Sequence, residues 1–92
     1  MSTFTVRKIG GSCPTQAYGR TAKGRPYYFR FRFNHWTLQV GDVDDADEPD
    51  TWLCHADLVA EGEGPNGPED RFDGDMESGD VLGKLDHYLR GL

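Results

Sequence analysis

The sequence has no long hydrophobic run. No apolar stretch approaches the roughly 18 residues that a membrane-spanning helix needs, and no leader of charged and then apolar residues follows Met1. Neither a membrane span nor a secretory signal is therefore expected, and the predicted location is the cytoplasm. A chain of 92 residues predicts one domain, spanning residues 1–92, with a single modest core.

Cysteine and histidine are also scarce. The two cysteines, Cys13 and Cys54, could form one disulfide, but reduced thiols are expected because nothing indicates export. Together with His35, His55 and His87, they show none of the paired spacings of a zinc site. Cys54 and His55 would point to opposite faces of a strand. We therefore expect a buried Cys54, a Cys13 exposed in a turn, and no catalytic cysteine.

Other signatures of chemistry are missing too. The acidic run at 42–53 fits the twelve-residue calcium loop only in part. Ala46, Asp47 and Leu53 occupy its fifth, sixth and twelfth positions, where a ligand, a glycine and a glutamate are required. Gly10-Gly11 precedes Cys-Pro rather than a helix, so it does not form a phosphate cradle. The sequence predicts no cofactor and no metal site, and the protein is expected not to be an enzyme.

Acidic residues are absent from residues 1–41, which carry seven of the ten basic residues. Residues 42–92 carry all sixteen Asp and Glu residues against three basic ones, so formal charges of +7 and −13 make up the net −6 of the chain. Such a difference between halves points to nucleic acid or to a partner that handles it. The alternative is that the acidic half neutralises the basic half within the fold.

The clearest structural pattern is a pair of alternating runs. Aromatic residues occupy every second position of residues 27–33, with Arg30 and Arg32 between them, which predicts a strand with one aromatic and one basic face. Asn34-His35 separates this strand from a second alternating run at 36–40 and predicts a two-residue hairpin loop. The predicted cross-strand pairs are Phe33 with Trp36, Phe31 with Leu38 and Phe29 with Val40.

The outer segments predict the rest of the fold. Residues 3–9 and 17–21 predict two more strands, so residues 1–41 are expected to form a basic, four-stranded antiparallel meander. Apolar residues at helical spacing predict a C-terminal helix within 78–92; they are Val81, Leu82, Leu85, Leu89 and Leu92. This helix should cover the aromatic face, since a bare aromatic face would aggregate. The predicted fold class is therefore α+β, an antiparallel four- or five-stranded sheet with the C-terminal helix packed on its aromatic face.

The segment between them, residues 42–77, is acidic and loop-rich. Its first run, 42–50, is expected to be a loop held extended by its own charge repulsion. Residues 51–60 fit either a strand or one face of a helix, and we expect a strand. Residues 61–70 contain glycines and prolines without periodicity and are expected to form a mobile loop.

Two surfaces are candidates for binding. The first consists of two clusters of carboxylates, which could occupy a basic groove built for nucleic acid. Its residues are Asp42, Asp44, Asp45, Asp47, Glu48, Asp50, Asp70, Asp73, Asp75 and Glu77. The second is the basic face of the predicted sheet, where arginine and tyrosine could meet the phosphates and bases of a single strand. Its residues are Arg20, Tyr28, Arg30 and Arg32.

In size, in its acidic clusters and in its lack of catalytic residues, the chain resembles the small phage-borne inhibitors of host defence. These include anti-CRISPR proteins and DNA mimics, which block a nuclease complex by filling its nucleic-acid channel. The resemblance implies a non-enzymatic inhibitor whose acidic surface engages the basic nucleic-acid-binding site of a partner protein. The basic first half departs from that pattern, and the alternative is a small module that binds single-stranded nucleic acid. A monomer or small homo-oligomer is expected.

Overall fold

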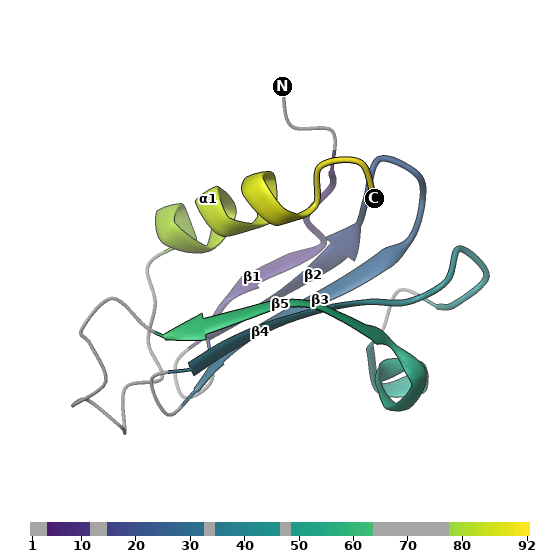
Figure 1. The fold of residues 1–92 in the computed structure, drawn as a ribbon, viewed down its shortest axis with the longest axis horizontal. Helices are drawn as coiled ribbons and strands as arrows, with labels where there is room; N and C mark the ends of the chain where they lie inside the picture. The colour runs from purple at the N-terminus through teal and green to yellow at the C-terminus, as the bar shows by residue number, and fades with distance from the viewer. Residues whose placement is uncertain (1–3, 12–14, 33–34, 47–48, 64–77) are drawn as a thin grey trace.

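The structure is a computed structural model that describes residues 4–11, 15–32, 35–46, 49–63 and 78–92. Within these residues, five strands form one antiparallel sheet in the order β1-β2-β3-β4-β5, and α1 lies over one face of it (Figure 1). The strands are β1 (Lys8–Gly10), β2 (Thr15–Arg20), β3 (Pro26–Arg32), β4 (His35–Val40) and β5 (Asp57–Glu63), and the helix is α1 (Ser78–Tyr88). The predicted α+β fold class is confirmed.

The aromatic face of β3 is the centre of the core. Tyr27, Phe29 and Phe31 are fully buried. Arg30 and Arg32, which alternate with Phe31 in the second half of the strand, are exposed. Each fully buried side chain of this size stabilises the fold by roughly 1.5–3 kcal/mol relative to an exposed one. The alternation in the sequence therefore identified the aromatic face correctly, whereas Tyr28 on the opposite face is buried beside the exposed arginines.

The register of the hairpin differs from the predicted one by two residues. The observed pairs are Phe31 with Trp36, Phe29 with Leu38, Tyr27 with Val40 and Arg32 with His35. A shift of two keeps every side chain on its face, so the alternation could not distinguish the two registers. The observed register buries Tyr27, whose hydroxyl donates to the carbonyl oxygen of Thr5 at 2.7 Å. Phe33 and Asn34 lie outside the described residues.

The C-terminal helix packs on the aromatic face as predicted. Val81, Leu85 and Leu89 recur at a spacing of four and are buried in the core cluster. The ring of Tyr88 lies 5.3 Å from the ring of Trp36, centroid to centroid. Leu82 is 39% exposed, so its assignment to the packed stripe was wrong. It lies one residue beyond Val81, about 100° around the helix.

The expected strand over 51–60 is only half correct. Two 3-10 helices, η1 (Pro49–Thr51) and η2 (Leu53–His55), occupy its first part, and β5 begins at Asp57. Trp52 lies between them and is fully buried. The buried indole is flanked by a compact turn on each side rather than by extended chain. In the first of these turns, the backbone N–H of Trp52 donates to Pro49 O at 3.1 Å.

The loop expected over 61–70 is wrong for its first three residues, since β5 continues to Glu63; residues 64–70 lie outside the described residues. Gly62, one of the glycines that suggested a loop, serves a close approach instead. A Cβ at Gly62 would lie 2.9 Å from Nε1 of Trp36, its cross-strand partner, so only glycine leaves room for the indole there. Composition alone does not distinguish a glycine of this kind from a turn glycine.

Candidate functional site

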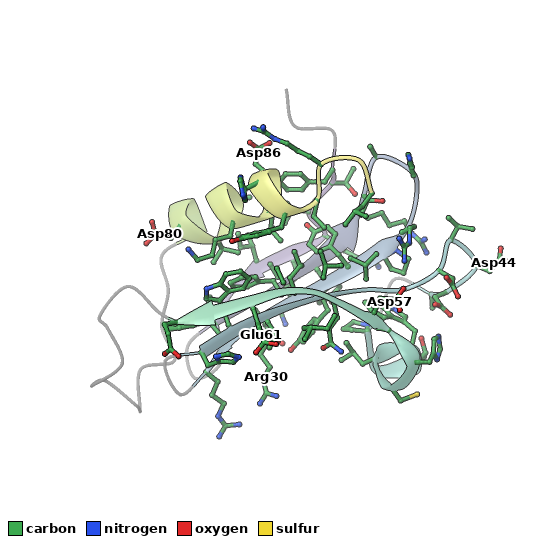
Figure 2. All side chains as sticks on the ribbon, viewed as in Figure 1. Arg30, Asp44, Asp57, Glu61, Asp80 and Asp86 are labelled. Atoms are coloured by element: carbon green, nitrogen blue, oxygen red, sulfur yellow. The ribbon has the colours of Figure 1, made fainter. Side chains whose placement is uncertain are left out.

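An acidic turn, residues Asp42–Asp45, lies beyond one end of the sheet, and Figure 2 shows Asp44 at its tip. The N–H of Asp45 donates to Asp42 O at 2.9 Å, and the N–H of Asp42 donates to Oδ2 of Asp45 at 2.8 Å. The side chains of Asp42 and Asp44 are exposed. The expectation of an extended loop is therefore wrong for these four residues, because two local hydrogen bonds outweigh the repulsion between screened surface charges.

Arg20, at the end of β2, fixes the acidic turn to the sheet. Its guanidinium donates to the carbonyl oxygen of Asp45 at 2.6 Å, to that of Gly24 at 2.6 Å and to that of Val43 at 3.4 Å. Bonds from an ionised donor are roughly twice as strong as neutral ones. Arg20 was predicted to contact nucleic acid, but its guanidinium is committed to the backbone of two turns. The nucleic-acid contact stays a prediction, and these bonds give Arg20 a structural role as well.

Asp45 is the inward-facing carboxylate of the acidic turn. Its side chain is 21% exposed and lies 3.2 Å from Nε2 of His55 in η2. The backbone hydrogen bond from Asp42 lowers the pKa of Asp45; partial desolvation opposes this, and the nearby His55 and Arg20 lower it further. Asp45 is thus an ionised structural residue, whereas Asp42 and Asp44 are presented to solvent.

The other predicted acidic residues are not placed together. The backbone of Asp50 lies in η1. The remaining six lie outside the described residues; they are Asp47, Glu48, Asp70, Asp73, Asp75 and Glu77. The described residues contain nine of the ten basic residues of the chain and nine of its sixteen acidic residues, so they carry no net formal charge.

The face of the sheet opposite α1, here called the open face, carries the exposed arginines of β3. Figure 2 shows Arg30 and Glu61 on this side, away from the helix. Arg30 and Arg32 line a shallow hollow of about 150 Å³ together with His35 and Thr37 of β4. Nε2 of His35 lies 3.0 Å from Oε1 of Glu61, so carboxylate and arginine share this face.

Tyr28 does not serve the open face as predicted. It is only 9% exposed, and its hydroxyl donates to Oε1 of Gln16 at 2.9 Å. A buried ring packed between neighbouring side chains cannot stack on a base, so its prediction as a stacking residue is wrong. Of the four residues predicted for this face, the structure leaves Arg30 and Arg32 exposed.

Two residues beside the acidic turn, His55 and Cys54, were not predicted to belong to a functional site. His55 contacts Asp45 through Nε2, and its Nδ1 lies 3.9 Å from Sγ of Cys54. Cys54 is exposed, so the prediction of a buried cysteine is wrong. In a 3-10 helix, successive side chains are about 120° apart instead of on opposite faces, and this brings Cys54 and His55 together. No spacing in the sequence pairs His55 with Asp45, ten residues earlier.

The described residues contain neither a metal-binding cluster nor a helix that could span a membrane. Among those that the structure describes, no group of three or more His, Cys, Asp and Glu residues could hold a metal ion. In this part of the chain, no helix is long and apolar enough to cross a membrane. The chain matches no family model, no curated protein and no solved structure.

Proposed function

We propose that this protein is a non-enzymatic inhibitor that binds another protein, and that its acidic turn engages the partner's basic, nucleic-acid-binding surface. One observation carries the proposal: Asp42 and Asp44 are exposed on a turn whose backbone is held by Arg20 and by the carboxylate of Asp45. Two negative charges at a fixed position on a rigid support are what a groove built for phosphates would bind.

Rigidity matters because association costs free energy. A flexible acidic loop would have to be ordered on binding, and each immobilised side chain costs about 0.5–1.5 kcal/mol. The backbone of the acidic turn is already ordered before binding, because its hydrogen bonds to Arg20 and between Asp42 and Asp45 are made in the unbound protein. Charge complementarity would then add a fast, salt-dependent association.

The partner that we propose is a nuclease of host defence, in line with the resemblance of this chain to anti-CRISPR proteins and DNA mimics. The proposed location is the cytoplasm, where such a nuclease meets its DNA. Purified RNA-guided and restriction nucleases should be assayed for DNA cleavage with increasing amounts of this protein. Inhibition of at least one nuclease, relieved by excess substrate DNA, is expected if the two compete for one groove.

A pair of variants tests whether the acidic turn is the binding surface. Asp42→Asn with Asp44→Asn should weaken inhibition about tenfold, since each rim charge contributes on the order of 0.5–1 kcal/mol. The matched control, Asp80→Asn with Asp86→Asn, removes the same charge from the exposed side of α1. An equal loss in both double variants would refute the assignment to the turn, and no inhibition of any nuclease would refute the partner class.

The hollow on the open face supports a second candidate, binding of single-stranded nucleic acid. Arg30, Arg32 and His35 could meet phosphates there, with Thr37 as a neutral hydrogen-bonding group. The surface is narrower than the sequence predicted, because Arg20 and Tyr28 are used elsewhere. Glu61 beside His35 opposes phosphate binding, so we rank this function second.

A further inference from the structure

Cys54, His55 and Asp45 lie in contact in that order, as thiol, imidazole and carboxylate. Sγ of Cys54 lies 3.9 Å from Nδ1 of His55, within reach of a hydrogen bond to the large sulfur atom. On the other side of the ring, Nε2 lies 3.2 Å from Oδ2 and 3.4 Å from Oδ1 of Asp45. A nucleophile beside a base that a third group orients is the arrangement that activates a thiol for attack.

The carboxylate of Asp45 determines the tautomer of His55, and therefore whether Nδ1, the ring nitrogen beside Sγ of Cys54, can accept a proton. Asp45 is ionised near neutral pH, because its pKa is lowered by the N–H of Asp42. An ionised carboxylate only accepts hydrogen bonds, so neutral His55 places its proton on Nε2 and donates it to Asp45. The lone pair on Nδ1 then faces the thiol of Cys54 and can take its proton.

The fold holds these groups at the surface. Trp52, fully buried, anchors the start of η2, and the N–H of His55 donates to the carbonyl oxygen of Trp52 at 3.1 Å. Asp45, in the acidic turn, contacts Nε2 of His55 on the ring edge away from Cys54. Cys54 is a free, exposed cysteine, so a small molecule can reach its sulfur.

We propose that Cys54 is a reactive thiol that exchanges with low-molecular-weight disulfides, with His55 as its base and Asp45 as the residue that positions His55. Nδ1 of His55 accepts the thiol proton, and the Cys54 thiolate attacks one sulfur of the small disulfide. A bond forms between Sγ and that sulfur while the S–S bond of the reagent breaks. The leaving thiolate takes up the proton, and the product is a mixed disulfide on Cys54.

The surrounding charges select the reagent. Asp42 and Asp44 are exposed on the turn that carries Asp45, and Asp57 follows η2 closely with 80% of its side chain exposed. Arg20 and Arg25 offset only part of this negative charge: Arg20 contacts the turn through backbone carbonyls, and Arg25 pairs with Asp57. An anionic disulfide would be repelled, so the site should prefer neutral or cationic disulfides.

The test uses the full chain with Cys13→Ser, so that Cys54 is its only thiol. Cystamine, a cationic disulfide, and glutathione disulfide, an anionic one, are each mixed with the protein, and mixed-disulfide formation is followed by mass spectrometry. Cystamine should react at least about threefold faster than glutathione disulfide, after correction for their rates with N-acetylcysteine amide. Raising the ionic strength should reduce that preference, because salt screens the acidic residues.

His55→Asn should slow the reaction with cystamine about tenfold, and Asp45→Asn should slow it about threefold. Imidazole added to the solution should restore part of the rate of His55→Asn by supplying the missing base, which it would not do after a loss of packing alone. His87→Asn, an exposed histidine on α1, is the matched control and should leave the rate unchanged. Circular dichroism shows whether each variant is folded.

A rate in folded His55→Asn within twofold of the parent would overturn the site, and so would an equal loss in the His87→Asn control. Equal corrected rates for the two disulfides would overturn the ligand class. If His55→Asn does not fold, His55→Gln and the folded Asp45→Asn variant answer the same question. This inference is independent of the proposed inhibitor, which is tested with Cys54 unmodified.

Discussion

Four arginines of the basic half form two pairs with different roles. Arg20 and Arg25 lie where β2 ends and β3 begins, and their guanidinium groups donate to carbonyl oxygens of Gly24, Asp45 and Gly41. Arg30 and Arg32 lie further along β3, are exposed, and line a hollow on the open face. The sequence assigns the same charge to all four. The structure shows that the first pair bonds to backbone carbonyls of the turns, whereas the second pair is exposed on the open face.

The different contacts of the two arginine pairs bear on the charge difference between the basic residues 1–41 and the acidic residues 42–92. Arg20 joins the two halves, because it donates to backbone carbonyls of the acidic turn and its charge also lowers the pKa of Asp45. The side chains of Asp42 and Asp44 are nevertheless exposed. The two halves are therefore joined through Arg20, and exposed carboxylates remain at the surface.

The largest difference between the pairs should appear in stability. Arg20→Ala removes two short bonds to carbonyl oxygens, and hydrogen bonds to charged groups contribute about 1.5–3 kcal/mol each. We expect the free energy of unfolding in urea to fall by about 2–4 kcal/mol. Arg30→Ala is the control and should change it by less than about 0.5 kcal/mol. Similar losses in both variants would abolish the distinction between the pairs.

The second difference should appear in binding. If the open face binds single-stranded nucleic acid, Arg30→Ala with Arg32→Ala should reduce affinity about tenfold at low salt. Losing two phosphate contacts should also make the slope of log K against log salt shallower by about 1.4. Lys23→Ala with Arg90→Ala removes the same charge elsewhere and should have the smaller effect. No binding by the parent protein, even at about 50 mM salt, would leave the acidic turn as the only candidate surface.

Much of the fold followed from the sequence, for identifiable reasons. The period of two at Tyr27, Phe29 and Phe31 is a local property, so the strand and its faces were predictable. The hairpin register was not, since a shift of two preserves the faces. Neither were η1 and η2, because they depend on burying Trp52 in a core assembled from distant residues.

The candidate site was less predictable than the fold. Counting charges located the acidic run but could not tell Asp45, whose carboxylate holds the turn, from the exposed Asp44. The role of Arg20 depends on carbonyl groups 23 and 25 residues away, which no local pattern encodes. The contact of His55 with Asp45 requires both the acidic turn and η2 to be in place.

A smaller loss of stability should distinguish the two contacts of Arg25, one with a carbonyl oxygen and one with a carboxylate. Its Nε donates to Gly41 O at 2.9 Å, and its ion pair with Asp57 is 3.4 Å long. Asp57 is 80% exposed on its side chain, and exposed ion pairs contribute about 0–1 kcal/mol. Arg25→Ala should therefore cost about 1–2 kcal/mol in urea unfolding, whereas Asp57→Asn should cost less than about 0.5 kcal/mol. A larger loss in Asp57→Asn would show that the ion pair, not the carbonyl bond, holds Arg25.

The smallest effect concerns the charge of Asp45 and appears only in acid. Because its pKa is lowered in the folded state, ionised Asp45 stabilises the fold above its unfolded pKa near 4, and this contribution is lost as the pH falls through the folded value. Asp45→Asn keeps an acceptor for the N–H of Asp42 but has no carboxylate to protonate. The difference in unfolding free energy between the parent and this variant should therefore shrink between about pH 6 and about pH 3. Asp44→Asn, on the same turn but exposed, should show no such convergence. If both variants converge with the parent to the same extent, Asp45 does not hold the acidic turn through its charge, and Arg20 alone fixes it to the sheet.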